Sequence, residues 1–224
     1  MAQGLTWILL PGLGGDARLF EPQRALGRLV VPRWIDPRPD EALSSYAARL
    51  AHAIRRDHAL DGPYALGGVS FGGVVAQEMA RVLDPQAVAL IASCRSSDAL
   101  APAVRWFRAG VELVPRPLAR WGVEQARTAI AARSAAFPFP RRLVAEMADS
   151  VSSEFIRWAT GAIVRWPGTQ LRGRRVRQIH GSRDTIIPAD RVWPDEWVPG
   201  GEHLINLTHP DQVNRFLQAT ADAR

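Results

Sequence analysis

The sequence of 224 residues predicts an α/β fold, because strand patterns and helical patterns alternate along most of the chain. Three stretches carry this prediction. An apolar run at 6–10 breaks into a glycine-rich loop, and a second run at 64–66 leads through Gly68–Gly72 into a helical pattern. A third strand pattern at 177–180 ends in a Gly-Ser turn. A chain of this size forms one sizeable core, so we expect a single domain over 1–224.

The first strand pattern, at 6–10, runs into the loop Pro11–Asp16. Glycines in such a loop leave its backbone N–H groups open to a ligand, and the N–H of Leu13 is a candidate donor to a developing oxyanion. A glycine-rich loop after a strand can instead cradle a phosphate group. Neither the lysine-bearing phosphate loop nor the dinucleotide fingerprint is present, which disfavours that alternative.

The pentapeptide Gly68–Gly72, with Ser70 at its centre, stands between a strand pattern and a helical pattern at 73–83. In that setting it indicates a nucleophile elbow, a sharp turn that lifts the serine hydroxyl clear of the sheet. Glycine removes side chains that would collide where strand and helix cross. Glycine pairs also serve close packing, so it is the strand-to-helix setting that favours catalysis. The N–H of Phe71, at the positive end of the helix dipole, is the second candidate oxyanion donor.

Cys94 follows the apolar run at 87–92 and is the one cysteine of the chain. One cysteine excludes an internal disulfide and agrees with a reducing cytoplasm, where we expect the protein to reside. Its place behind an apolar run indicates a small buried side chain rather than a nucleophile.

Between Cys94 and Trp166 the alternation of strand and helix stops, and the chain becomes helical and rich in arginine, aromatic residues and proline. We expect a helical cap over residues 95–166, since a stretch of this length is short for an independent core. Prolines at 115–117 and 137–140 predict breaks between its helices. Aromatic side chains that face the serine would form an acyl pocket, but they could equally hold the cap together. No substrate-binding residue is assigned.

A nucleophilic serine needs a histidine to accept its proton and a carboxylate to orient that histidine. Asp184 follows the third strand pattern, which places it on the same edge of a parallel sheet as Ser70. Asp98, just after the preceding strand, remains the alternative carboxylate. His203 follows a brief strand and a glycine turn, so it can reach over that edge as the base.

The other four histidines have structural interpretations. His52 and His58 lie within, or at the end of, a helical pattern at 44–60. His180 lies within the strand that leads to the acid turn, and His209 precedes a final helical pattern with proline in its first turn.

The formal net charge is +6, and all 28 basic residues are arginine. A basic surface favours acidic partners. The densest basic run, at 172–177, reads as a solvated loop, and no nucleic-acid-binding module is recognisable. No apolar run is long enough to span a membrane, and the start lacks the pattern of a secretion signal. We therefore expect neither nucleic acid nor a membrane as a partner.

Together these motifs resemble the α/β-hydrolase superfamily over nearly the whole chain. Residues 9–15 resemble its oxyanion loop, 68–72 its elbow, 180–184 its acid turn and 201–210 its histidine loop. Within the superfamily the chain is similar to the small carboxylesterase-like group that includes the pimeloyl-acyl-carrier-protein methyl esterases. The resemblance implies a mostly parallel central sheet with helices on both faces and an inserted helical cap. The first hairpin of larger members is missing or reduced, which implies a minimal version of the fold.

The resemblance, with the order Ser70, Asp184, His203, indicates a serine hydrolase that cleaves a carboxylic ester through an acyl-enzyme intermediate. The N–H groups of Leu13 and Phe71 would form the oxyanion hole, and the chemistry requires no cofactor or metal ion. The expected partner is a small-molecule ester. The alternatives are an esterase or thioesterase that acts on an acidic acyl-carrier protein, and a non-catalytic binding protein. Lyases and cofactor-free peroxidases share this scaffold too.

Overall fold

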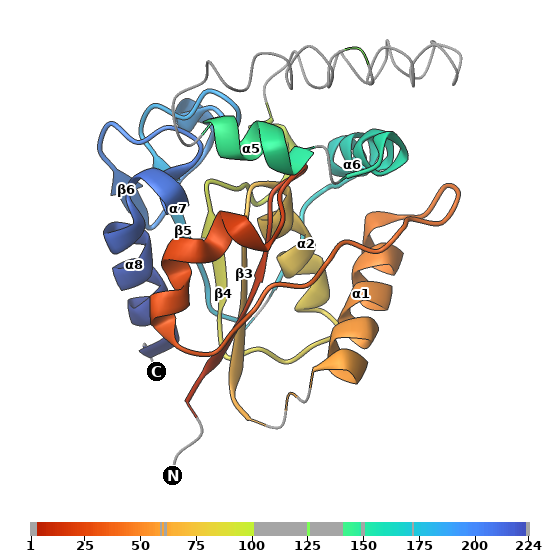
Figure 1. Ribbon diagram of the computed structural model, residues 1–224, viewed down its shortest axis with the longest axis horizontal. Helices are drawn as coiled ribbons and strands as arrows, with labels where there is room; N and C mark the ends of the chain where they lie inside the picture. Colours follow the sequence, from red (N-terminus) through yellow and green to blue (C-terminus); the bar gives the residue numbers. More distant parts are fainter. Residues whose placement is uncertain are drawn as a thin grey trace.

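The computed structural model describes residues 4–58, 60, 62–100, 125, 141–148, 151–171 and 173–222. Within them, six strands form one sheet in the order β2-β1-β3-β4-β5-β6 (Figure 1). The strands are β1 (Thr6–Leu10), β2 (Leu29–Val30), β3 (Tyr64–Val69), β4 (Val88–Ile91), β5 (Val176–Gly181) and β6 (Glu196–Val198). Every neighbouring pair is parallel, which confirms the predicted α/β fold.

Helices cover both faces of the sheet, as predicted. The described helices are α1 (Leu43–Asp57), α2 (Phe71–Met79), α5 (Arg141–Ala148), α6 (Ser153–Arg165), α7 (Ile205–Thr208) and α8 (Pro210–Asp222), with short 3-10 helices η1 (Ala17–Leu26), η2 (Ser97–Ala99) and η3 (Ala189–Arg191). In Figure 1, α1 and α2 lie on one side of the sheet, whereas α8 and η1 lie on the other.

The two covered faces explain why β1 is apolar at almost every position. Successive side chains of a strand point to opposite faces. Ile8 and Leu10 accordingly pack into the core formed with α1, α2 and α6, while Trp7 and Leu9 pack into the core formed with η1, α7 and α8. Continuous apolar strands of this kind are typical of parallel sheets that are buried on both sides.

The parallel order gathers the carboxyl ends of the strands at one edge of the sheet. β3 lies between β1 and β4, and β5 lies between β4 and β6. Leu13 therefore follows β1, Ser70 follows β3, Asp184 follows β5 and His203 follows β6, all at that edge.

The end of α2 differs from the predicted helical pattern, which extends to Leu83. The α-helix ends at Met79, and the next turn tightens, because the N–H of Val82 donates to the carbonyl oxygen of Met79 at 2.9 Å. Pro85 restricts Asp84, the residue before it, to extended backbone, which keeps the helix from continuing past this point.

The described part of the predicted cap consists of η2, α5 and α6. Figure 1 shows α5 and α6 at the end of the sheet where the strands finish, and α6 contacts α1, α2 and η2. The proline-rich stretches at 115–117 and 137–140 lie outside the described residues. The boundaries of the cap at 95–166 therefore stay a prediction.

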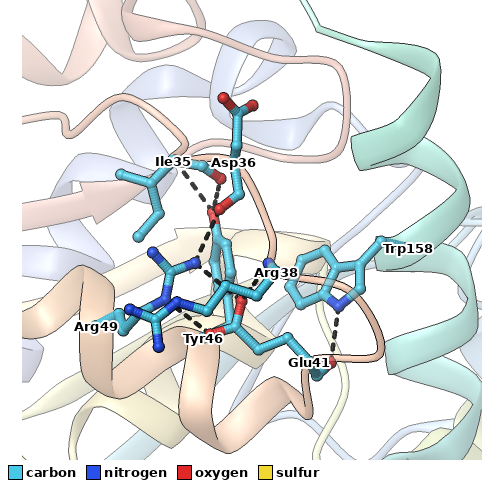
Figure 2. A network of polar contacts seen from close by, with 7 residues as sticks. All are labelled: Ile35, Asp36, Arg38, Glu41, Tyr46, Arg49 and Trp158. Atoms are coloured by element: carbon cyan, nitrogen blue, oxygen red, sulfur yellow. Dashed lines mark hydrogen bonds and ion pairs between the residues drawn. The ribbon is translucent and has the colours of Figure 1, made fainter.

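A polar network ties α6 to the start of α1 (Figure 2). The indole N–H of Trp158 donates to the carbonyl oxygen of Glu41 at 2.8 Å, and the Glu41 carboxylate pairs with Arg49 at 2.7 Å. The hydroxyl group of Tyr46 donates to the carbonyl oxygen of Ile35 and accepts from its N–H. These contacts fix the loop before α1, and through Trp158 they hold α6 against it.

An aromatic cluster links α6 to the first residue of α2. The ring centroid of Phe71 lies 5.6 Å from that of Trp34, and 6.2 Å from those of Phe155 and Trp158. The contacts with Phe155 and Trp158 are edge-to-face, a favourable arrangement for aromatic pairs. The turn that carries Ser70 therefore runs directly into a packed aromatic core.

Candidate active site

Ser70 occupies a strained turn between β3 and α2. Its φ of 54° and ψ of −122° lie in a region that residues with a side chain rarely adopt. The turn is held on both sides of the serine. Its N–H donates to the carbonyl oxygen of Ile91 at 3.0 Å, and its carbonyl oxygen accepts from the N–H of Gly73 at 3.0 Å and from Ser93 Oγ at 2.7 Å. Such strain costs about 1–3 kcal/mol and is typical of functional sites.

The glycines around Ser70 are required by close backbone approach. A Cβ atom at Gly68 would overlap the backbone of Gly72, and one at Gly72 would overlap the carbonyl oxygens of Leu10 and Pro11. The structure therefore gives the physical reason for the pentapeptide: strand, helix and the loop after β1 meet too closely for any side chain.

The loop after β1 lies directly beside Ser70. A Cβ atom at Gly12 would lie 3.6 Å from the Cβ atom of Ser70, and the N–H of Gly15 closes the turn by donating to the carbonyl oxygen of Gly12 at 2.9 Å. Within the described residues, the N–H of Leu13 donates to no backbone acceptor. The N–H of Phe71 begins α2, where the helix itself offers no acceptor. Both predicted donors thus lie in the backbone that surrounds the serine.

The carboxyl group of Asp184 is buried and has four nitrogen atoms around it. Oδ1 accepts from the backbone N–H groups of Ile186 at 2.9 Å and Ile187 at 3.0 Å, while Oδ2 lies 2.7 Å from His203 Nδ1 and 3.2 Å from His180 Nε2. Burial alone would raise the pKa of Asp184, but the hydrogen bonds from His180 and His203 outweigh burial and hold that pKa well below its usual range. The group is therefore a carboxylate at neutral pH.

Backbone pairing fixes the acid turn against the histidine loop. The N–H of Arg183 donates to the carbonyl oxygen of Gly201 at 2.8 Å, and the N–H of Ser182 donates to that of Val198 at 3.1 Å. The hydroxyl group of Ser182 also accepts from the N–H of Gly200 at 2.8 Å. The distance between Asp184 and His203 is thus set by the pairing of β5 with β6 and not by two independent loops.

His203 is partly open to solvent, with 16% of its side chain exposed. A carboxylate can only accept, so Nδ1 carries the proton in the contact with Asp184, and neutral imidazole then has a lone pair at Nε2. In the structure the side chains of Ser70 and His203 are not hydrogen-bonded to each other. Catalytic hydrogen bonds often tighten only when a substrate is bound.

His180 is the residue of this site that the sequence interpretation missed. It is fully buried at the end of β5, where Nε2 lies 3.2 Å from Asp184 Oδ2 and 3.0 Å from the carbonyl oxygen of Ile187. Its position four residues before Asp184, across a Gly-Ser turn, places both residues near one strand end but does not indicate that the two side chains meet.

The alternative acid, Asp98, lies elsewhere on the same edge. It is exposed in η2, and its Oδ2 lies 3.5 Å from Ser96 Oγ. The carboxylate that touches His203 is that of Asp184.

Three other histidines lie outside the site. His209 lies between α7 and α8, where its Nδ1 is 2.8 Å from Thr208 Oγ1 and its carbonyl oxygen accepts from the N–H of Val213. His52 is exposed on α1, and His58 caps the end of that helix. These positions agree with the structural interpretations.

Cys94 is fully buried, as predicted, and burial raises the pKa of its thiol to about 12, so the thiol stays protonated. In the part of the chain that the structure describes, no three histidine, cysteine or acidic side chains are arranged to hold a metal ion. None of the described helices combines the length and the apolar character that crossing a membrane requires.

An open depression of about 500 Å³ lies over the acid turn, lined by Ser182, Arg183, Asp184, Thr185, Pro188, Ala189 and Asp190. Neither Ser70 nor His203 lines it. The depression is therefore not where a substrate would meet the serine.

Comparisons with known proteins agree with this fold. A sequence profile of the alpha/beta hydrolase family matches residues 7–216. No curated protein matches the sequence. Among solved structures, a thermophilic esterase from Thermogutta terrifontis is similar with a TM-score of 0.70 at 20% identity, over 98% of this chain and 90% of that one.

Two further solved structures show the same likeness. A hydrolase from Pseudomonas aeruginosa has a TM-score of 0.70 at 16% identity, over 99% of this chain and 92% of its own. The RedJ thioesterase from the prodiginine biosynthetic pathway in Streptomyces coelicolor has a TM-score of 0.65 at 18% identity, over 98% of this chain and 86% of its own. At such low identity, these structures show that the fold is shared.

Proposed function

This chain belongs to the alpha/beta hydrolase family, and from that premise we propose that it is a serine hydrolase that cleaves a carboxylic ester through a covalent acyl-enzyme intermediate. Family membership supports hydrolysis as the reaction class. The observation that carries the finer assignment is the hydrogen bond of 2.7 Å between Asp184 Oδ2 and His203 Nδ1, at the sheet edge where Ser70 stands in its strained turn.

In the first half of the proposed reaction, Ser70 Oγ forms a bond to the carbonyl carbon of the ester. The hydroxyl proton passes to His203 Nε2 as that bond forms, because an un-ionised serine is a weak nucleophile. The carbonyl oxygen becomes negative and accepts from the N–H groups of Leu13 and Phe71. The bond to the alcohol then breaks, and the alcohol leaves with the proton from His203.

In the second half, water repeats the same sequence. His203 Nε2 accepts a proton from water while the water oxygen bonds to the acyl carbon. The bond between the acyl carbon and Ser70 Oγ then breaks, and the proton passes from His203 to the serine oxygen. Asp184 holds the imidazole in the tautomer with Nδ1–H and stabilises the imidazolium that forms twice per turnover.

The test combines a fluorophosphonate probe with turnover of a short p-nitrophenyl ester. We expect the probe to label Ser70, and Ser70→Ala to abolish labelling and lower kcat at least about 10³-fold. Ser44→Ala, an exposed serine on α1, is the matched control and should behave like the wild type. Equal turnover by a folded Ser70→Ala variant would rule the proposal out.

A second candidate keeps the same three residues but takes its acyl group from an acidic carrier protein, as an ester or a thioester. Two observations favour it: the formal net charge of +6, carried entirely by arginine, and the structural likeness to a thioesterase of a biosynthetic pathway. Charge attraction between proteins weakens with salt. Activity on a carrier-bound acyl group should then fall steeply between low and high salt, while activity on a small ester should not.

A further inference from the structure

We propose that His180 is a positioning residue that holds the carboxylate of Asp184 in the one orientation in which it can orient His203. The inference rests on the proposed function, because it concerns the carboxylate of that site. The contact that carries it is the approach of His180 Nε2 to Asp184 Oδ2 at 3.2 Å, inside a fully buried strand end.

The protonation of His180 follows from its neighbours. Nε2 faces two groups that can only accept, the carboxylate of Asp184 and the carbonyl oxygen of Ile187 at 3.0 Å. Nε2 therefore carries a proton, which it donates to the carbonyl oxygen of Ile187 while it lies 3.2 Å from Asp184 Oδ2. Nδ1 is buried and has no partner among the described residues, so a second proton there would lack an acceptor. His180 accordingly donates through Nε2.

The N–H at His180 Nε2 holds the turn that follows Asp184, through the carbonyl oxygen of Ile187. Ile187 donates its N–H to Asp184 Oδ1 and offers its carbonyl oxygen to His180, whose Nε2 also lies against Asp184 Oδ2, so the three residues form one ring of polar contacts. With the N–H of Ile186 added, the carboxylate is fixed at both oxygens before His203 touches it. Rotation of the carboxylate would break at least two of these bonds.

A purely structural role accounts poorly for the side chain at this position. The ring packs edge-on against Trp197, with centroids 6.1 Å apart, which an apolar side chain could do as well. The histidine leaves its Nδ1 atom buried without a partner, which costs free energy, and an apolar side chain would avoid that cost. What a histidine adds here is the hydrogen bond at Nε2.

Oδ2 also serves His203, so the two histidines share one oxygen atom. A second donor reduces the negative charge that Oδ2 presents to the first. Loss of His180 should therefore have two separable effects: the carboxylate becomes less well oriented, and its remaining bond to His203 becomes stronger.

The experiment compares His180→Leu, which removes the donor, with His180→Gln, whose longer amide can place an N–H where Nε2 lies. His52→Leu, at an exposed position on α1, is the matched control for loss of a histidine. If His180→Leu does not fold, His180→Asn replaces it, since its shorter amide is polar but cannot reach Asp184.

For the p-nitrophenyl ester we expect His180→Leu to lower kcat about tenfold and to change KM less than about twofold, because orientation and not binding is lost. His180→Gln should stay within about threefold of the wild type in kcat. The proposal would be overturned if His180→Leu lowered stability without lowering kcat more than it changed KM. It would also be overturned if His180→Leu and His180→Gln lost the same factor in kcat.

A proton NMR readout does not depend on activity. The proton between His203 Nδ1 and Asp184 Oδ2 should resonate further downfield in folded His180→Leu than in the wild type, and His180→Gln should reproduce the wild-type signal. An unchanged signal in His180→Leu would equally refute the role. Labelling of Ser70 in the wild type, measured alongside, tells whether the proposed function has failed instead.

Discussion

Replacing Asp184 by asparagine changes one carboxylate oxygen into an NH₂ group, and the structure determines which one. The Oδ1 position accepts from the backbone N–H groups of Ile186 and Ile187, whose directions are fixed by the turn. An NH₂ group there would leave two buried donors without an acceptor, at about 1–3 kcal/mol each. The NH₂ group therefore takes the Oδ2 position, where it faces His203 Nδ1 and His180 Nε2. The N–H at His180 Nε2 keeps the carbonyl oxygen of Ile187 as its acceptor, so no buried donor loses its last partner there.

The expected loss of activity follows from this placement. His203 Nδ1 must then accept, so its single proton moves to Nε2, the atom that should take the proton of Ser70. The side chains stay in place while the tautomer is wrong. We expect kcat to fall about 10⁴-fold, which corresponds to about 5 kcal/mol of lost transition-state stabilisation.

The assay is steady-state turnover of a p-nitrophenyl ester by Asp184→Asn, with Asp98→Asn as the matched control. Asp98 is exposed, so its substitution should change kcat less than about twofold. Far-UV circular dichroism confirms that each variant is folded. A deep loss in Asp98→Asn with full activity in Asp184→Asn would show that the orienting carboxylate had been misassigned.

Three further predictions concern stability and are measured by urea unfolding. Gly72→Ala should lower the free energy of unfolding by about 3 kcal/mol or more, since its Cβ atom would overlap the carbonyl oxygen of Leu10; a variant as stable as the wild type would contradict the close approach. Ser70→Gly should be about 1–2 kcal/mol more stable than Ser70→Ala, because glycine relieves the strain at φ 54°, and the reverse order would mean that the turn is not strained. The pKa of Asp184 is lowered by folding, so its carboxylate stabilises the protein above the ordinary pKa of about 4 and loses this effect as the pH falls below it. The free energy of unfolding that is lost in Asp184→Asn should accordingly be larger at pH 7 than at pH 3. A loss that grows in acid would show that folding does not lower the pKa of Asp184.

The elbow and the strands around it were predictable because their determinants are adjacent in the sequence. A strained turn between a strand and a helix requires glycine on both sides of Ser70, and the apolar runs before and after it mark the buried strands. The order of the strand ends then placed Asp184 and His203 at the same edge, and the structure brings these two side chains into contact.

The contact between His180 and Asp184 was not predictable in this way. It depends on how the turn after Asp184 folds back, since the carbonyl oxygen of Ile187 is what holds the ring of His180 in place. A histidine inside a strand pattern carries no sign of which buried group it will meet.

The aromatic cluster could not be predicted from sequence patterns for a similar reason. Trp34 lies in a segment with no regular pattern, yet its ring meets Phe71 and Phe155 from distant parts of the chain. Such pairings are set by tertiary packing, whereas the periodicity of a helix indicates only which of its faces is buried.

Phe71 has one function for its backbone and another for its ring. In the proposed reaction its N–H donates to the oxyanion, while its ring packs between Trp34 and the α6 side chains Phe155 and Trp158. A bulkier or smaller side chain on that face of α6 would therefore shift Phe71, the residue whose N–H is proposed to donate to the oxyanion. Repacking this cluster would therefore need paired substitutions, with position 34 adjusted whenever 155 or 158 is changed.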